Sequence, residues 1–209
     1  MSAYFYVSYG LLWVLVVVLA TLMLLVYRHF GLMAMGTYEG VQRDGLSVGE
    51  DAPVIHGFTA SGDPTTITIG DGVRRLVLFA ATYCEPCDEV VPWVQHLNAL
   101  NAGIEAIAIV RGPDQEATSF EQSHGPGLPT VAEGPGEVFG QYKVRFTPFA
   151  HVVGGDGRVL SKGLCGSATD LVNLLRSAGF DEPATALETL AAAADPDRHN
   201  SELDVKAVR

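Results

Sequence analysis

The first part of the chain is one apolar run. No charged residue occurs between Ser2 and Tyr27, and residues 11–26 are almost entirely Leu, Val, Ala, Trp and Met. A run of about 20 apolar residues is long enough to cross a membrane as a helix. A cleaved signal peptide would have a basic segment before the run and a small-residue cleavage site after it. No Lys or Arg precedes the run, and Tyr-Arg-His-Phe follows it at 27–30. The pattern predicts an uncleaved transmembrane anchor over residues 1–30.

After a polar, glycine-containing linker at 31–45, short apolar stretches alternate with amphipathic ones, which predicts an α/β domain over residues 46–180. The expected strands are an edge strand within Val48–Phe58, then Thr65–Ile69, Leu76–Ala81, Ile104–Val110, Pro129–Ala132, Phe149–Val153 and Arg158–Ser161. The expected helices begin at or just after Cys84 and at Pro113, Gly136 and Ser167. The remainder, 181–209, is rich in Ala, Asp and Glu and is interpreted as a disordered acidic tail in which Ala184–Ala194 forms a helix only transiently.

Composition narrows the classes of function. The formal net charge is −11 and the sequence pI is near 4.8. No basic stripe is available to meet phosphates, so a nucleic-acid partner is excluded. Three cysteines are too few for a disulfide scaffold. These thiols are therefore expected to be functional rather than structural.

The chemistry concentrates at Cys84-Glu85-Pro86-Cys87, between the apolar run Leu76–Ala81 and an amphipathic run with Val90, Val91, Val94 and Leu97 on one face. A strand, a C-x-x-C motif and a helix in this order are typical of thiol redox chemistry. Cys84 is expected at the helix N-terminus, where unpaired N–H groups and the helix dipole favour a thiolate. Pro86 suits the first helical turn. We therefore expect Cys84 to be the nucleophile and Cys87 the resolving thiol.

Two other interpretations of the motif are half of a zinc site and a pair of inert core cysteines. A structural zinc site needs four ligands. The chain has only one further cysteine, Cys165, and its six histidines are scattered without ligand spacing. Redox chemistry is therefore favoured over metal binding, and no cofactor is expected.

From Leu46 to Gly179 the order of elements around the motif resembles the thioredoxin fold, a central mixed sheet flanked by helices. Pro92 stands where thioredoxins have the proline that kinks the redox helix, and Thr147-Pro148 resembles their cis-proline. The longer segment between Ile104 and Pro148 is similar to the membrane-anchored TlpA/ResA type. The anchor, the linker and the opening motif at 45–53 most resemble the methylamine-utilisation MauD proteins. The resemblance implies that Tyr83, Thr147 and Pro148 contact the substrate.

The sequence also departs from these families. Leu78 occupies the position of the buried Asp of thioredoxins, and Val90 that of a Glu in the ResA type. The usual acid for proton relay is therefore missing. One interpretation is that Glu85 substitutes for it; the other, which we favour because the turn is exposed, is that Glu85 is solvated. In this fold Cys165 would border the substrate groove and could have its thiolate favoured by a helix start. The alternative is that Cys165 is a small apolar filler.

We therefore expect a membrane-tethered oxidoreductase that acts on protein thiols or disulfides. The resemblance implies cytochrome c maturation or methylamine dehydrogenase maturation, with a redox-recharging partner such as a membrane thiol transporter. A non-enzymatic assembly scaffold is the first alternative. Peroxide reduction is the second, although its usual P-x-x-x-T-x-x-C pattern is absent here.

Orientation rests on two opposing arguments. Arg28 and Arg43 follow the span and no basic residue precedes it, which by the positive-inside rule places the domain in the cytoplasm. Disulfides, however, persist at oxidising surfaces. We expect a single-pass protein of the cell membrane with its thioredoxin-like domain outside the cytoplasm, in the periplasm of a two-membrane cell.

Overall fold

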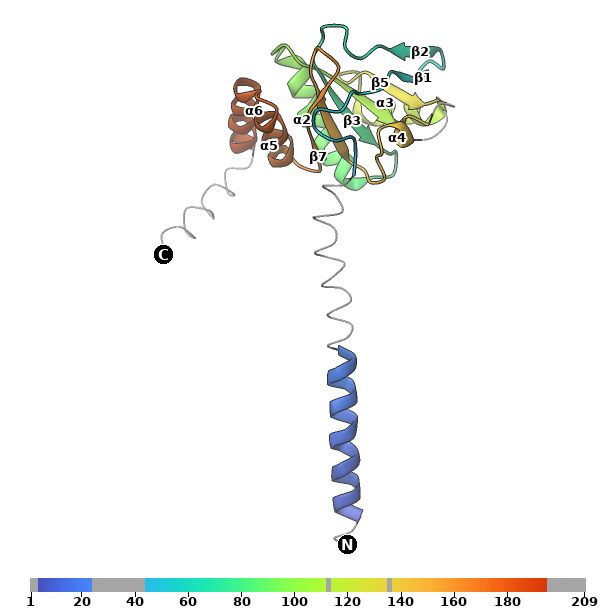
Figure 1. The fold of residues 1–209 in the computed structure, drawn as a ribbon, viewed down its shortest axis with the longest axis vertical. Helices are drawn as coiled ribbons and strands as arrows, with labels where there is room; N and C mark the ends of the chain where they lie inside the picture. The colour runs from blue at the N-terminus through green and yellow to red at the C-terminus, as the bar shows by residue number, and fades with distance from the viewer. Residues whose placement is uncertain (1–3, 24–43, 112–113, 135–136, 195–209) are drawn as a thin grey trace. The chain divides into compact units, whose positions relative to one another are not determined.

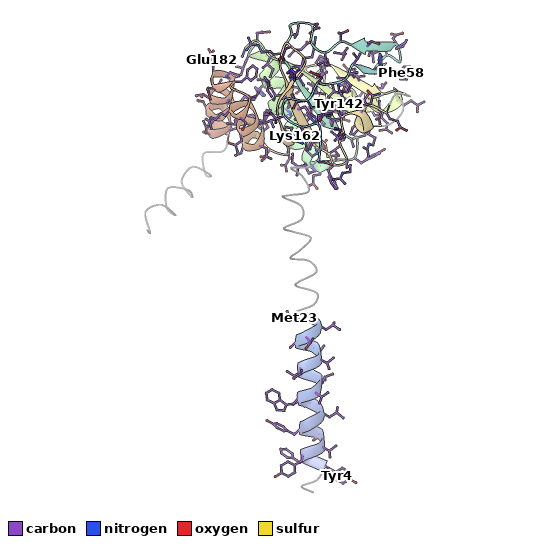
Figure 2. All side chains as sticks on the ribbon, viewed as in Figure 1. Tyr4, Met23, Phe58, Tyr142, Lys162 and Glu182 are labelled. Atoms are coloured by element: carbon purple, nitrogen blue, oxygen red, sulfur yellow. A yellow bond between two sulfur atoms is a disulfide. The ribbon has the colours of Figure 1, made fainter. Side chains whose placement is uncertain are left out.

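The computed structural model describes residues 4–23, 44–111, 114–134 and 137–194, in two units that comprise residues 1–43 and 44–209. The described residues of the first unit form one helix, Tyr4–Met23, whose 20 residues are apolar enough to cross a membrane and whose side chains are exposed (Figure 2). At about 1.5 Å per residue it is about 30 Å long, close to the thickness of the hydrocarbon core. This helix fits the predicted anchor. The rest of the predicted anchor and most of the linker lie outside the described residues.

The second unit is built on a mixed sheet whose seven strands in the described residues have the order β2-β1-β5-β4-β3-β6-β7 (Figure 1). The strands are β1 (Ile55–Thr59), β2 (Pro64–Ile67), β3 (Arg75–Ala80), β4 (Glu105–Val110), β5 (Thr130–Glu133), β6 (Phe149–Val153) and β7 (Val159–Leu164). β3, β4 and β5 are parallel to one another, and β6 runs antiparallel to β3. The carboxyl end of β3 and the amino end of β6 therefore lie at the same edge of the sheet.

The prediction that the first strand of the domain forms an edge is wrong. β1 lies between β2 and β5, and β2 forms the outer edge. The reason lies in Gly57, where a Cβ atom would come within 2.2 Å of the Ala132 carbonyl oxygen. Because glycine lacks that atom, β1 can approach β5 closely enough to pair with it.

Helices cover both faces of the sheet. They are α2 (Glu85–Ala99), α3 (Asp114–His124), α4 (Val138–Gln141), α5 (Ala168–Ser177) and α6 (Asp181–Ala194) (Figure 1). Apolar side chains from α2, α3, α5 and α6 share one core with alternate residues of β3, β4 and β6. On the opposite face an aromatic cluster surrounds Phe79; its other members are Phe139, Tyr142, Phe149 and His151. This burial on both faces explains why every residue of β3 is buried.

The interpretation of residues 181–209 as a disordered tail does not hold for its first half. Residues 181–194 form α6, which packs against α5 and α2. Pro183, Ala184 and Leu187 are buried, and Ala184 and Leu187 belong to the main core. The apolar residues of this Ala-rich segment recur at helical spacing, so one face becomes a core surface once α5 is in place. Residues 195–209 lie outside the described residues.

Candidate functional site

The sequence predicts the local structure of the redox motif correctly. β3 ends at Ala80, α2 begins at Glu85, and Cys84 is the N-cap residue. Pro86 lies in the first turn, where its missing N–H leaves no helical hydrogen bond unmade. The Cys87 and Asp88 amides donate to the Cys84 carbonyl oxygen, at 2.8 and 3.2 Å. This turn brings the two Cα atoms to 5.2 Å, within the range a disulfide requires.

Cys84 and Cys87 are joined in a disulfide, and their environments differ. Cys87 is fully buried among the core residues of α2, whereas Cys84 is half-buried and packs at the margin of that core. Cys84 is therefore the more accessible of the two cysteines. The more accessible cysteine is the one that the sequence predicts to be the nucleophile, and the roles of the two cysteines stay a prediction.

The loop before β6 meets the motif. The Thr147–Pro148 peptide bond is cis, as expected from the resemblance. Pro148 is itself buried and Thr147 half-buried. A Cβ atom built on Gly166 would lie 3.6 Å from Pro86 and 3.9 Å from Pro148. The redox turn, the cis-proline loop and the segment after β7 therefore converge at this edge of the sheet.

Two exposed aromatic residues flank these segments. Tyr83, directly before Cys84, is 96% exposed, and Phe146, directly before Thr147, is 55% exposed. The guanidinium carbon of Arg145 lies 5.7 Å from the centroid of the Phe146 ring. Phe146 was not singled out from the sequence, although an aromatic residue next to the Thr-Pro pair was the available signal.

The loop that carries Phe146 is held by the start of the domain. The Asp44 carboxylate is buried and accepts hydrogen bonds from the Arg145 backbone N–H at 3.1 Å and from its Nε at 2.5 Å. Lys162 donates to the carbonyl oxygens of Asp44 and Gly45. The sequence analysis placed Asp44 and Gly45 in the linker at 31–45. The structure instead packs these two residues against the loop that precedes Pro148.

Cys165 is free and fully buried. Its backbone N–H donates to the Pro148 carbonyl oxygen at 3.1 Å, so the residue does adjoin the site. Burial, with a smaller contribution from Asp170, raises the pKa of its thiol to about 12. The expectation that a helix start could favour its thiolate is wrong, because α5 begins at Ala168 with Ser167 as its cap. The filler interpretation fits the structure.

The apolar replacements noted in the sequence are part of the core. Leu78 and Val90 are both fully buried, and Glu85 is exposed as expected.

The structure shows two acids at the motif that sequence reasoning missed. The Thr82 hydroxyl donates to the carboxylate of Glu116 on α3. Asp88, in the first turn of α2, contacts Nε2 of His124 at 2.9 Å. Neither pair has a local signal in the sequence, because only the fold brings α3 next to the redox turn and the start of α2.

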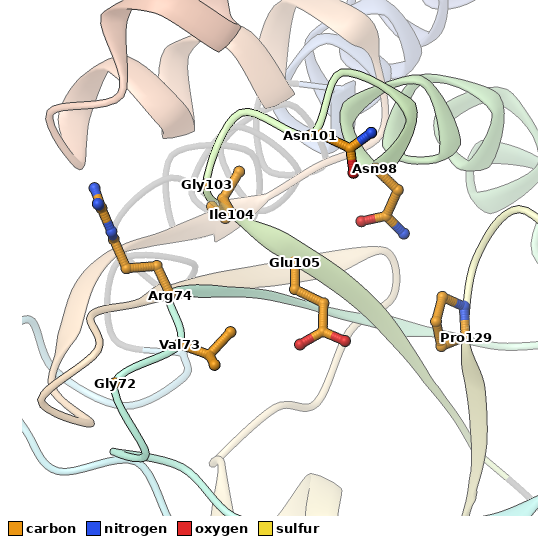
Figure 3. A pocket seen from close by; sticks show the side chains of 9 residues that line it. All are labelled: Gly72, Val73, Arg74, Asn98, Asn101, Gly103, Ile104, Glu105 and Pro129. Atoms are coloured by element: carbon orange, nitrogen blue, oxygen red, sulfur yellow. The ribbon is translucent and has the colours of Figure 1, made fainter.

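A cleft of about 590 Å³ lies at the opposite end of the sheet (Figure 3). It is lined by residues before β3, around the end of α2, around the start of β4 and directly before β5: Gly72, Val73, Arg74, Asn98, Asn101, Gly103, Ile104, Glu105 and Pro129. Because β3 and α2 point in opposite directions, this end is remote from the start of α2. The cleft contains no residue of the redox motif and is separate from the site described above.

Comparisons with known proteins agree with this architecture, although no family model matches the chain. The methylamine utilization protein MauD of Methylophilus methylotrophus is 28% identical over 172 residues, covering 80% of this chain and 81% of that protein. The thiol-disulfide oxidoreductase ResA of Bacillus subtilis is 26% identical over 142 residues, covering 64% of this chain and 79% of that protein. The crystal structure of a putative thiol:disulfide interchange protein DsbE from Chlorobium tepidum superposes with a TM-score of 0.56 at 20% identity, covering 64% of this chain and 98% of that one.

The two sequence relatives match most of the chain, and the solved structure shares its fold. The C-x-x-C disulfide stands at the start of α2, where sequence and fold together predict it. The chain therefore has a thioredoxin-like fold, and its sequence and layout are similar to those of MauD and of the thiol-disulfide oxidoreductase ResA.

Proposed function

We propose that this protein uses Cys84 and Cys87 to exchange disulfides with protein substrates while tethered to a membrane and facing the extracytoplasmic side. The observation that carries the proposal is the disulfide at the start of α2, which joins one half-buried and one fully buried cysteine. A structural staple needs no such asymmetry, whereas stepwise thiol exchange does.

Reduction of a substrate would proceed in two exchanges. The Cys84 thiolate attacks one sulfur of the substrate disulfide, forms a mixed disulfide and expels the other substrate sulfur as a thiolate. The Cys87 thiol, after losing its proton, attacks Sγ of Cys84. The Cys84–Cys87 disulfide forms, the second substrate thiolate leaves, and two electrons have passed to the substrate. The same steps in reverse oxidise a substrate dithiol.

The helix start supports the first step. As N-cap of α2, Cys84 lies at the positive end of the helix dipole, where a thiolate is favoured. Two acidic residues in that turn, Glu85 and Asp88, oppose this by like charge. The balance between the two effects decides whether the pair acts mainly as a reductant or as an oxidant.

Substrate binding is assigned to the exposed surface around the two sulfurs. Tyr83 offers an aromatic face beside Cys84, and the backbone of Thr147 before the cis bond to Pro148 offers polar groups to an extended peptide. The buried Pro148 would act by fixing the direction of that backbone. By resemblance to MauD and ResA, the substrates would be proteins undergoing cytochrome c or methylamine dehydrogenase maturation. A membrane thiol transporter would recharge the pair.

Trapping tests the assignment of the two cysteines. Cys87→Ser leaves Cys84 able to attack but removes the resolving thiol, so mixed disulfides with native partners should accumulate on non-reducing gels. Cys84→Ser is the matched control and should accumulate none. Equal trapping by both variants would show that the roles are wrongly assigned. No trapping, together with partner binding that survives both substitutions, would favour the assembly scaffold.

Orientation needs a separate experiment. A reporter that is active only outside the cytoplasm, fused after Ala194 at the end of α6, should be active. Activity from a cytoplasm-only reporter at the same position would instead support the positive-inside argument from Arg28 and would place the dithiol in the cytoplasm.

A further inference from the structure

Glu116 is the acid that the fold brings to the segment preceding Cys84. It lies in the second half of the first turn of α3, is half-buried, and accepts a hydrogen bond from the Thr82 hydroxyl. Its neighbours on the helix, Ala117 and Phe120, are buried, which anchors this part of α3 to the sheet and the core. The carboxylate is therefore held by an element other than the redox helix.

Thr82 links the Glu116 carboxylate to the redox motif. It lies in the connection between Ala80, the last residue of β3, and Cys84, the cap of α2. The connection is only residues 81–83, and Tyr83, which follows Thr82, is almost fully exposed. The bond to Glu116 is the side-chain hydrogen bond that restrains this connection in the described structure. Glu116 therefore fixes both the path of the chain into Cys84 and a negative charge beside that path.

Other charged groups at this edge have different partners or are exposed. On α2, Glu85 and Glu89 are exposed, and Asp88 contacts His124 of α3. In the first turn of α5, the Asp170 carboxylate accepts from the Gly166 N–H and the Ser167 hydroxyl. Arg111, after β4, donates to the Val144 carbonyl oxygen and stacks over Phe139. Among the described residues, Glu116 is the acid bonded to the segment that enters the motif.

We propose that Glu116 is a positioning residue that makes the Cys84–Cys87 pair a stronger reductant. The inference rests on the proposed redox function and specifies how that function is tuned. A negative charge fixed beside the entry to Cys84 disfavours its thiolate by like-charge repulsion. A less stable thiolate makes the reduced pair less stable relative to the disulfide, which lowers the reduction potential. With Leu78 and Val90 in the core, α3 supplies the charge that those positions lack.

The experiment measures the redox equilibrium of the full-length protein in detergent. The protein is equilibrated with glutathione buffers, quenched by alkylation, and the reduced fraction is read by mass spectrometry. Glu116→Gln keeps an acceptor for Thr82 and removes the charge. The matched control, Glu121→Gln, removes the same charge more than one turn further along α3.

We expect Glu116→Gln to raise the equilibrium constant for reduction by glutathione about three- to tenfold, tenfold being about 30 mV for a two-electron couple. The alkylation profile of Cys84 should move to lower pH, and Glu121→Gln should stay within about twofold of the unmodified protein. Introducing Glu116→Gln into a Thr82→Val protein should produce less than half of the shift, because the carboxylate is then no longer held at the motif.

The outcomes separate this inference from the function on which it rests. If the unmodified pair equilibrates normally and Glu116→Gln matches it or the Glu121 control, the role of Glu116 is refuted. A full shift in the Thr82→Val background would refute positioning through Thr82. A pair that equilibrates with no thiol buffer would refute the oxidoreductase function itself, and the role of Glu116 with it.

Discussion

Leu187 tests whether α6 is part of the folded domain. Its side chain is only 1% exposed and belongs to the core shared by α2 and α5. Leu190, one turn later on the same helix, is 40% exposed. Substituting alanine at each position removes the same three carbon atoms and leaves helix propensity almost unchanged. The two variants therefore differ mainly in how much buried contact is lost.

The expected magnitude follows from that burial. Losing three buried methyl or methylene-sized groups costs about 0.8 kcal/mol each in transfer free energy, and a residual cavity adds to this cost. α6 is an outer layer that can partly close the space, so we expect Leu187→Ala to lower the free energy of unfolding by about 2–3 kcal/mol. For a domain of this size that corresponds to a melting temperature lower by about 4–12 °C. Leu190→Ala should cost less than about 1 kcal/mol.

The assay is thermal and urea unfolding of the unit 44–209, followed by circular dichroism. Equal small effects of the two substitutions would refute the packing of α6. That outcome would also restore the interpretation of residues 181–209 as a disordered tail. A large effect of Leu187→Ala alone would place the end of the folded domain beyond residue 180, the limit expected from the sequence.

Two further predictions concern buried titratable groups. Because burial raises the pKa of the Cys165 thiol to about 12, iodoacetamide at pH 8 should label the reduced Cys84 but not Cys165 unless urea is present. Stability should also fall as the pH rises from about 9 towards 12; labelling of native Cys165 at pH 8 would contradict this burial. Burial lowers the pKa of His151 to about 3, so the unfolded chain binds a proton below about pH 6.5 that the folded chain does not. Stability should therefore fall by about 2 kcal/mol between pH 7 and pH 5. Urea unfolding of His151→Gln should lack most of that loss, and an unchanged pH dependence would refute the assignment.

The sequence alone was sufficient wherever structure depends on neighbours along the chain. The buried strand before Cys84, the helix after it and the inward face of Val90, Val91, Val94 and Leu97 all follow from local periodicity. The apolar helix 4–23 follows from composition and length. The hairpin of β6 and β7 follows from a glycine-rich turn between two apolar runs. These features need no knowledge of which elements pack together.

Tertiary structure decided every feature that depends on the order of strands and the packing of helices. Judged from its sequence neighbours, Gly57 only weakens a strand. In the structure its missing side chain lets β1 lie next to β5 in the interior of the sheet. Judged from its sequence neighbours, Asp44 is a linker residue. In the structure it accepts a hydrogen bond from Arg145, 101 residues away in the chain, and so becomes part of the site. Glu116 and Thr82 are separated by 34 residues and share no periodic pattern. Which polar residues meet depends on how the helices pack on the sheet. The spacing of hydrophobic residues predicts the individual elements, but it does not predict these pairs.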